Sequence, residues 1–270
     1  MSFAEIDYKV TGHVAIVTLN RPEQLNAWTA VMGREVRKAM EMAAADDHVR
    51  VIVLTGAGRG FCSGADMKLL SGISTGGGST EAADAPFDAN SRSDFQRKNT
   101  YFPAIPKPII AAVNGPCAGL GMCFALFCDM RFAADNAVFT TAFARRGLIA
   151  EHGMSWTLPR LIGMSAATDL LLSGRKVAAD EALRLKLVDR VYPAADLMPA
   201  VLAYAKDLAE LSSPRSLRVM KKQLWDTQMQ TLNEAMDVAD HEMALSFKSD
   251  DFKEGVKHFM EKRAPAFTGR

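Results

Sequence analysis

Two glycine-rich segments in the first half of the chain could present backbone N–H groups to a ligand. The first, VIVLTGAGRGFCSGADMK, runs from Val51 to Lys68, and the second, KPIIAAVNGPCAGLGMCFALFCDMRFA, from Lys107 to Ala133. In each, an apolar run predicts a buried strand that leads into a loop, where glycines let the backbone approach a bound molecule. In the second segment the loop opens a helix, whose first N–H groups are unpaired and carry partial positive charge. This arrangement suits an oxygen that becomes negative during a reaction.

Known nucleotide motifs do not fit the first segment. The dinucleotide fingerprint GxGxxG would need a third glycine after Gly56 and Gly58, at a position that Phe61 occupies. No Gly-Lys-Ser or Gly-Lys-Thr follows, as a Walker motif would require. Taken alone, these glycines are explained by a loop that merely turns, so a binding role depends on both segments together.

Four further stretches of the chain contribute to a family resemblance. They are LNRPEQLNAW near the start, RRGLIAEHG at residues 145–153, LLLSGRKVAADEALRLKLVDRV at residues 170–191 and FMEKRAPAF at residues 259–267. With the two glycine-rich segments they resemble the crotonase (enoyl-CoA hydratase/isomerase) superfamily over nearly the whole chain. The resemblance implies an α/β fold, a crotonase-like spiral of ββα units with a C-terminal helical trimerisation region. It also implies an acyl-CoA thioester as substrate, no separate cofactor, and a homo-oligomer, either a trimer or a dimer of trimers.

The resemblance assigns an oxyanion hole to two backbone N–H groups. The thioester oxygen would lie between the N–H of Ala65, in the sequence GAD, and that of Leu120, in the sequence GLG. Coenzyme A would bend over the loops that carry these residues, with help from a neighbouring subunit. The substrate-binding residues implied in this way are Ala27, Gly64, Asp66, Met67, Lys68, Gly119 and Phe143, with Phe259 and Lys262 from the neighbour. Lys68 and Lys262 are equally well explained as solvated surface charges. Asp66 and Asp129 occur in the family motifs mainly as residues that fix loops and turns.

The acidic residues decide which reaction is expected. The two glutamates of the family's hydratases fall here on Cys123 and Phe143, neither of which can replace a carboxylate as general base. An acid occurs instead at Glu151, in GLIAEHG, which resembles the position of the single catalytic acid of Δ3,Δ2-enoyl-CoA isomerases. The resemblance thus implies an isomerase that shifts a 3-enoyl-CoA double bond to 2-enoyl-CoA. The oxyanion hole would stabilise the enolate while Glu151 moves the proton from C2 to C4.

Several alternatives stay open. The protein could be an enoyl-CoA hydratase of fatty acid β-oxidation in which Glu151 has taken over the acid/base work, or a non-catalytic acyl-CoA-binding member. Glu151 could also be an acid favoured by the dipole at a helix N-terminus. His152 follows it, but sequential neighbours do not face each other on a helix, so we interpret His152 as a supporting or surface residue. Ser155, in GMSWT, lacks the final glycine of a nucleophile elbow.

Composition excludes several other classes. With 32 Lys and Arg against 31 Asp and Glu, the formal charge of +1 gives no field that would attract nucleic acid or a membrane surface. The first ten residues, MSFAEIDYKV, lack the basic and apolar stretches of a secretory signal. The four cysteines show no paired CxxC spacing, so we expect no metal site, and a reducing, cytoplasmic location. Residues 109–128 are uncharged and long enough to cross a membrane, but Asn114, Gly115 and Pro116 predict a strand, a loop and a helix instead.

Hydrophobic periodicity predicts one α/β region and one helical region. Strands are expected at residues 14–19, 49–55, 107–113, 131–134 and 137–139, and helices at residues 29–46 and 120–128. The first helix should start at Thr29 and bury a stripe of Val31, Val36, Ala39 and Met40. Residues 71–93, rich in glycine and serine, are expected to form a surface segment that covers the ligand.

From residue 196 onward the pattern is helical, with helices expected at residues 196–211, 214–225, 231–247 and 250–263. We therefore divide the chain into a spiral core with the acyl-CoA site, residues 1–195, and a helical region, residues 196–270. The helical region should form the oligomer and cover the coenzyme A pocket. Its apolar residues, which include Leu217, Met220, Leu224 and those of 243–247, exceed what a solvated appendage would carry.

Overall fold

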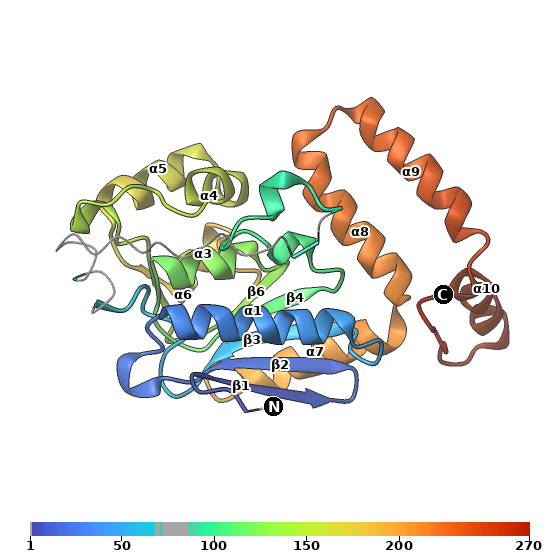
Figure 1. Cartoon of the computed structure of the whole chain (residues 1–270), viewed down its shortest axis with the longest axis horizontal. Helices are drawn as coiled ribbons and strands as arrows, with labels where there is room; N and C mark the ends of the chain where they lie inside the picture. The colour runs from blue at the N-terminus through green and yellow to red at the C-terminus, as the bar shows by residue number, and fades with distance from the viewer. Residues whose placement is uncertain (1, 68–70, 72–86, 89) are drawn as a thin grey trace.

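Two β-sheets organise the computed structural model, which describes residues 2–67, 71, 87–88 and 90–270. Their strands are β1 (Ile6–Thr11), β2 (Val14–Leu19), β3 (Val51–Gly56), β4 (Ile109–Val113), β5 (Cys117–Ala118), β6 (Met130–Ala134), β7 (Val138–Thr140), β8 (Val177–Ala178) and β9 (Arg190–Tyr192). The larger sheet has the order β1-β2-β3-β4-β6-β9 and the smaller one β5-β7-β8. In the larger sheet β1 is antiparallel to β2, and the other neighbouring pairs are parallel (Figure 1).

Helices cover both faces of the larger sheet, and those after residue 213 form a C-terminal arm. They are α1 (Ala30–Ala45), α3 (Leu120–Phe127), α4 (Met154–Ile162), α5 (Met164–Ser173), α6 (Ala179–Arg184), α7 (Leu197–Leu211), α8 (Pro214–Asp226), α9 (Leu232–Ser246) and α10 (Asp250–Glu261). Every strand and helix that the periodicity predicts is present, with bounds shifted by a few residues at most. The sequence interpretation missed β1, β5, β8, β9 and α4 to α6.

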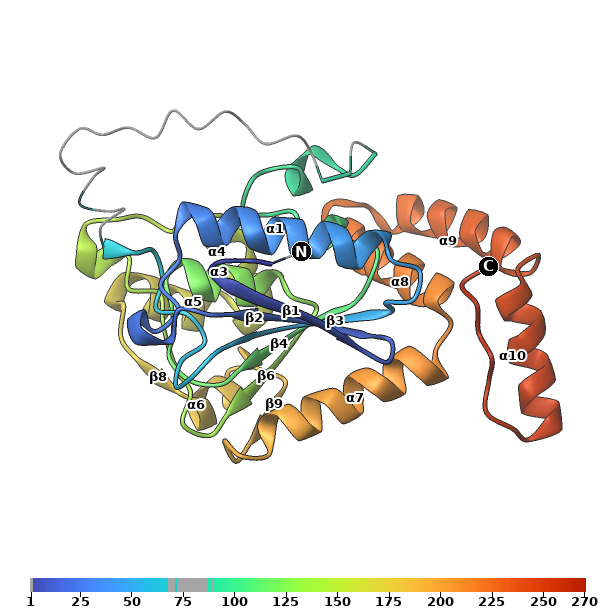
Figure 2. The same ribbon diagram turned by 60° about the horizontal axis from the view of Figure 1, so that its bottom comes forward.

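The central strand β3 shows how the sheet is buried on two sides. All six of its residues are buried. Val51 and Val53 pack in the cluster that contains α7, whereas Ile52 and Leu54 pack in the larger cluster that contains α1 and α3. Figure 2 shows the sheet between α1 and α7. Burial on both faces explains why this parallel strand is a continuous apolar run.

Helix α1 begins as the sequence predicts. The Thr29 side chain accepts a hydrogen bond from the Met32 N–H at 3.0 Å, which satisfies one of the free donors of the first turn. The buried face differs from the prediction in one residue. Val31 is 37% exposed and Met32 is fully buried in its place, because the apolar face is centred on Met32, Val36 and Met40.

The uncharged segment at residues 109–128 folds into β4, β5 and α3, which confirms the predicted strand, loop and helix. All eight residues of α3 are buried. Among the described residues, no helix combines the length and apolar character needed to cross a membrane.

The helical region begins with a helix that belongs to the core. Leu197, Val201, Ala205 and Ala209 of α7 pack on the sheet, so the core extends beyond residue 195. The following helix, α8, is fixed to the body by Asp129. This carboxylate lies 2.8 Å from the Lys221 ammonium and accepts hydrogen bonds from the Trp225 indole at 2.9 Å and the Ile109 N–H at 2.7 Å. As predicted, Asp129 has a structural role.

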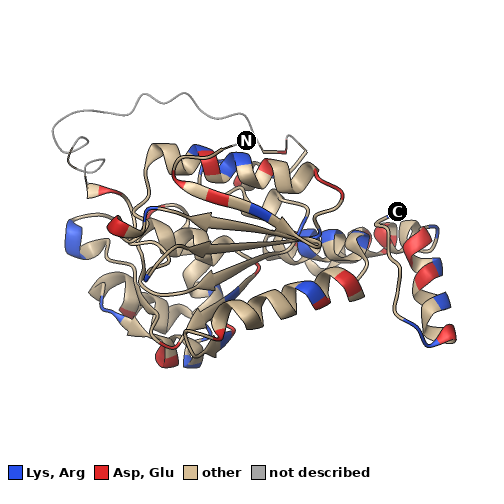
Figure 3. Cartoon of the chain, turned by 90° about the horizontal axis from the view of Figure 1, so that it is seen from below, with Lys and Arg blue, Asp and Glu red and all other residues tan. Residues whose placement is uncertain are grey.

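Helices α9 and α10 extend away from the body (Figure 1). α9 has no buried residue, and α10 buries only Asp251. Charged residues of both signs line the outer faces of α1 and α10, while the inner strands of the sheet are almost free of them (Figure 3). Large apolar side chains are exposed along the arm: Met220, Leu224, Leu232, Met236, Met243, Phe247, Val256, Phe259 and Met260. Most of the predicted covering segment, residues 71–93, lies outside the described residues.

Candidate active site

The two glycine-rich loops lie side by side. The Ala118 N–H donates to the Cys62 carbonyl at 2.9 Å, and the Cys62 N–H donates to the Pro116 carbonyl at 3.1 Å. The loops approach so closely that a Cβ on Gly121 would lie 2.5 Å from that of Cys62. Only glycine fits at residue 121, because no real Cβ tolerates such a contact.

Gly64 and Gly119 bring the ends of these loops into contact. Both have positive φ, +98° and +49°, a conformation that side chains rarely adopt. A Cβ on Gly64 would lie 3.1 Å from the Ala118 carbonyl oxygen, and one on Gly119 would lie 3.9 Å from the Gly64 Cα. The residues that follow each glycine, Ala65 and Leu120, are therefore held as neighbours.

Both of these residues have an N–H group available for a ligand. Ala65 forms an isolated β-bridge with Trp28. The two hydrogen bonds of this bridge are donated by the N–H groups of Trp28 and Asp66, and not by that of Ala65. Leu120 is the first residue of α3, where the N–H has no partner within the helix. Among the described residues, neither the Ala65 nor the Leu120 N–H donates a hydrogen bond. Two adjacent free donors, one at a helix N-terminus, can stabilise an oxyanion.

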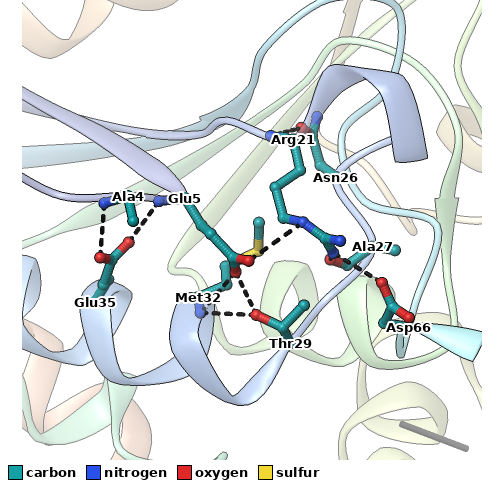
Figure 4. Close-up of polar contacts among 9 residues, drawn as sticks. All are labelled: Ala4, Glu5, Arg21, Asn26, Ala27, Thr29, Met32, Glu35 and Asp66. Carbon is teal, nitrogen blue, oxygen red and sulfur yellow. Dashed lines mark hydrogen bonds and ion pairs between the residues drawn. The ribbon is translucent and has the colours of Figure 1, made fainter. Parts of the chain in front are cut away.

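Arg21 supports the loop that carries Ala65 (Figure 4). Its guanidinium donates to the Ala27 carbonyl at 2.6 Å and to the Asp66 carboxylate at 2.9 Å, on either side of the Trp28–Ala65 bridge. It also lies 3.4 Å from the Glu5 carboxylate. Asp66 thus faces Arg21, and its carboxylate holds the loop in place. This geometry agrees with the loop-fixing role that the sequence suggests for Asp66.

Asn26 joins the loop before α1 to the first glycine-rich segment. Its side chain is fully buried and donates to the carbonyls of Ala57 and Gly60 at 3.0 and 2.7 Å, while its oxygen accepts from the Arg21 N–H at 2.8 Å. Its φ of +54° turns the chain so that Ala27 follows directly beside the site. Asparagine tolerates this left-handed conformation better than most residues.

Glu151 lies in the turn before α4, close to the first turn of α3. Its carbonyl oxygen is 3.8 Å from the Cys123 Sγ and accepts a hydrogen bond from the Met154 N–H at 3.0 Å. Cys123 follows Leu120 by three residues, which puts both on one side of α3. The Glu151 side chain is 37% exposed. The loop that carries the Glu151 carboxylate therefore contacts α3 at Cys123, one helical turn from the Leu120 N–H.

The two positions that hold glutamates in hydratases are buried here. Phe143 packs its ring against Gly119, and Cys123 is 1% exposed. Burial, followed by the nearby charge of Glu151, raises the pKa of the Cys123 thiol far above its usual range. A thiol in this state stays protonated at neutral pH and cannot act as a general base.

His152 lies in a turn and not on a helix, so the expectation that it does not face Glu151 is wrong. The turn has φ of +51° at His152 and +73° at Gly153, and it brings the His152 Nε2 to 3.7 Å from the Glu151 Oε2. The Asn99 amide contacts the other ring nitrogen, Nδ1, at 3.0 Å. Burial lowers the pKa of His152, and the Glu151 carboxylate opposes that change.

The chain is similar to known proteins in both sequence and structure. The enoyl-CoA hydratase/isomerase family matches residues 9–270. A "probable enoyl-CoA hydratase" of Rhodobacter capsulatus is 36% identical over 270 residues, 100% of both chains. The 1,2-epoxyphenylacetyl-CoA isomerase of Escherichia coli is 35% identical over 259 residues, 95% of both chains. The crystal structure of a "probable enoyl-CoA hydratase/isomerase" from Mycobacterium abscessus has a TM-score of 0.88 and 32% identity, covering 98% of this chain and 99% of that one.

The chain belongs to the enoyl-CoA hydratase/isomerase family. The match confirms the crotonase resemblance and the α/β fold with C-terminal helices. The protein is accordingly an acyl-CoA-processing enzyme of this family. The relatives carry both hydratase and isomerase names, so the family alone does not assign the reaction.

The residues expected to bind coenzyme A are spread over the molecule. Ala27 is buried beside the oxyanion loop, and Met67 is 66% exposed at the end of that loop. Lys68 lies outside the described residues. Phe259, 78% exposed, and Lys262 lie at the end of α10, far from α4 and α5 along the long axis of the molecule (Figures 1 and 2). If Phe259 and Lys262 bind coenzyme A, they do so at the site of another subunit.

Sequence interpretation missed three residues that support the site. Arg21 and Asn26 lie in the recognised stretch LNRPEQLNAW, but nothing in that stretch indicates that Arg21 pairs with Asp66, 45 residues later. Asn99 gives no signal at all, because it is one polar residue in a polar segment and its partner His152 is 53 residues away.

Proposed function

We propose that the protein is an enoyl-CoA isomerase that converts 3-enoyl-CoA into 2-enoyl-CoA. The supporting observation is the position of Glu151, whose turn contacts Cys123 one helical turn from the Leu120 N–H. Neither Cys123 nor Phe143 supplies the carboxylates that hydration by the usual route requires. A single carboxylate is sufficient to move a double bond, because the same group can accept and return one proton.

In this mechanism the thioester oxygen accepts hydrogen bonds from the N–H groups of Ala65 and Leu120. The positive end of α3 and these donors stabilise the charge that builds up on oxygen as the C2 proton leaves. The Glu151 carboxylate takes that proton, and the carboxylic acid so formed delivers it to C4. A donor that stabilises the developing charge more than it stabilises the bound substrate lowers the barrier. Equal stabilisation of both states would leave the barrier unchanged.

The coenzyme A thioester is the substrate in this proposal, and no further cofactor takes part. Coenzyme A would contact Ala27, Gly64, Met67, Lys68 and Gly119, with Phe143 beside the acyl group. The partner subunit of a trimer or dimer of trimers would add its own copies of the α10 residues, Phe259 and Lys262. We place the enzyme in the cytoplasm, because its four cysteines are free thiols.

A hydratase is the second candidate, and the name of the Rhodobacter capsulatus relative favours it. In that case Glu151 would activate water for addition to trans-2-enoyl-CoA. The substrates separate the possibilities when the absorbance of the conjugated thioester is followed. With cis-3-enoyl-CoA an isomerase gives a rise; with trans-2-enoyl-CoA a hydratase gives a fall. A protein that only binds acyl-CoA changes neither signal.

Isotope transfer adds a second test of the isomerase. If one carboxylate carries the proton from C2 to C4, part of a C2 deuterium label should appear at C4 of the product in ordinary water. Complete loss of the label to solvent would oppose a single shielded shuttle. A fall in absorbance with trans-2-enoyl-CoA and no rise with cis-3-enoyl-CoA would replace the proposal by the hydratase.

A further inference from the structure

The imidazole of His152 is held between Asn99 and Glu151. The Asn99 Nδ2 is 3.0 Å from the ring Nδ1, and the Glu151 Oε2 is 3.7 Å from the ring Nε2. Consecutive left-handed residues, His152 and Gly153, make the turn that allows this contact. Gly153 in turn packs against α3, since a Cβ there would lie 3.4 Å from the Phe127 ring. The turn that carries His152 thus packs against the same helix that presents the Leu120 N–H.

The contact with Asn99 sets the tautomer of His152. The Asn99 amide nitrogen can only donate, so the ring Nδ1 that faces it accepts and carries no proton. The proton of the neutral ring is then on Nε2, the nitrogen directed at the Glu151 carboxylate. The separation of 3.7 Å is longer than a hydrogen bond, and a small rotation of the half-exposed Glu151 side chain would shorten it. Contacts of this kind often tighten when substrate binds.

The surroundings favour the neutral form of this ring. Burial lowers the pKa of His152 and outweighs the opposite effect of Glu151. A cavity of about 470 Å³ opens beside the ring and is lined in addition by Asn99, Phe127 and Trp156. The charged residues on its wall are Asp94, Arg97 and Lys98.

We propose that His152 is a positioning residue for Glu151: oriented by Asn99, its Nε2–H directs the carboxylate toward the proton that is transferred. Protonation of His152 at acidic pH puts a cation beside Glu151, which makes the carboxylate a weaker base. This inference rests on the proposed role of Glu151. It extends that role with a chain of contacts, from Asn99 to His152 to Glu151, that connects the carboxylate to the wall of the cavity.

The test uses variants that respect the backbone. His152→Asn removes the imidazole and still tolerates a φ of +51°. Asn99→Ala leaves the imidazole but removes the group that orients it. Lys186→Asn is the matched control, because Lys186 is exposed, has a φ of +64° and does not line the cavity. The rate of the wild type and of each variant is measured with cis-3-enoyl-CoA from pH 5 to pH 9, together with thermal unfolding.

We expect kcat to fall about 10- to 100-fold in both His152→Asn and Asn99→Ala, the range that misplacement of a catalytic group produces, with KM changed less than about threefold. Because Asn99 acts through His152, adding Asn99→Ala to His152→Asn should lower kcat by less than about twofold more. The acidic limb of the kcat profile should move to lower pH in His152→Asn, since the imidazole no longer contributes to it. Lys186→Asn should behave as wild type.

Unchanged kcat and an unchanged acidic limb in His152→Asn would overturn the inference. So would additive losses in the double variant. Should His152→Asn fail to fold, Asn99→Ala carries the same expectation for kcat and the acidic limb. Glu151→Gln, measured in parallel, separates the two proposals. If Glu151→Gln is inactive and His152→Asn is not impaired, only the positioning role fails; if Glu151→Gln is fully active, the proposed function fails with it.

Discussion

The Cys123 thiol lies 3.8 Å from the carbonyl oxygen of Glu151, which ties the turn before α4 to the first turn of α3. Leu120, the oxyanion donor in our proposal, begins that same turn of α3. The packing of α3 against the turn therefore sets the separation between the oxyanion donor and the carboxylate. In a hydratase the residue at position 123 would itself be a carboxylate, whereas here a buried thiol only contacts the backbone of the acid.

Introducing the missing acids tests this comparison with the hydratases. Cys123→Glu combined with Phe143→Glu should add slow hydration of trans-2-enoyl-CoA to the activity, measured as a fall in conjugated absorbance. Both positions are buried, so each carboxylate costs several kcal/mol or stays protonated. Cys123→Gln with Phe143→Gln is the control of matched size and should not hydrate. Equal hydration by both double variants would contradict the assignment of these positions.

Arg21 offers a test of how the oxyanion loop is held. Arg21→Met keeps the apolar stem but removes the guanidinium that donates to both the Asp66 carboxylate and the Ala27 carbonyl. We expect a loss of about 1–3 kcal/mol in the free energy of unfolding, measured with urea, because two part-buried acceptors lose hydrogen bonds to a charged donor. We also expect kcat/KM to fall about tenfold or more as the Ala65 N–H is displaced.

The matched control for Arg21 is Arg184→Met. Arg184 also pairs with a carboxylate, that of Asp180 at 2.7 Å, but both side chains are more than two-thirds exposed. Such a surface pair is worth less than about 1 kcal/mol. If the two variants lose the same stability and neither loses activity, Arg21 does not support the site in the way its contacts indicate.

The exposed apolar residues of the C-terminal arm lead to a prediction about assembly. Met220 and Leu224, 57% and 70% exposed, are four residues apart and lie on one face of α8. Together with the apolar residues of α9 and α10, they are expected to be covered by other subunits of a trimer or hexamer. Light scattering at micromolar concentration should give that mass, and Met220→Glu with Leu224→Glu should reduce it. Lys206→Glu, on the exposed side of α7, should leave the mass unchanged; a monomeric wild type would contradict the prediction.

The sequence predicts elements where the apolar pattern is long. Residues 14–19, 30–45 and the helices after residue 196 match the prediction within a few residues, because three or more turns or a complete strand repeat one period. β5 and β8 have two residues each, too few to show any period. β1 was missed although Ile6, Tyr8 and Val10 alternate with polar residues. Helix α4 contains Pro159, which interrupts the helical pattern.

Within the site, the predictions that rest on the glycine-rich motifs agree with the structure. Glycines at residues 64 and 119 point to close backbone contact, and the loops meet there. The turn at His152 could not be predicted, because a left-handed non-glycine residue has no sequence signature. The pairs Arg21–Asp66 and Asn99–His152 join residues far apart in the chain, and only the folded topology brings them together.

The buried cysteines give a prediction about pH. Burial raises the pKa of the Cys62 thiol to about 12, whereas in the unfolded chain a cysteine has a pKa of about 8.5. Between these values the unfolded state loses the proton and the folded state keeps it, so stability falls as pH rises from about 8.5 to about 12. Cys62→Ala should make the decline of the urea midpoint with pH shallower. In the native protein, none of the four buried thiols should react rapidly with a thiol reagent at pH 8, and all four should react in denaturant.

The proton shuttle itself is tested by Glu151→Gln. This change keeps the size of the side chain and removes only its basicity, so isomerase turnover should fall by about 10² to 10⁴, as expected for loss of a general base. Affinity for acyl-CoA should stay within a few fold, since the proposed oxyanion donors are the N–H groups of Ala65 and Leu120. Thermal stability should also stay near that of the wild type, because the Glu151 side chain is 37% exposed and the contacts that fix the turn use its backbone. A large loss of affinity would mean that Glu151 supports the pocket, and undiminished isomerase turnover would remove it from the mechanism.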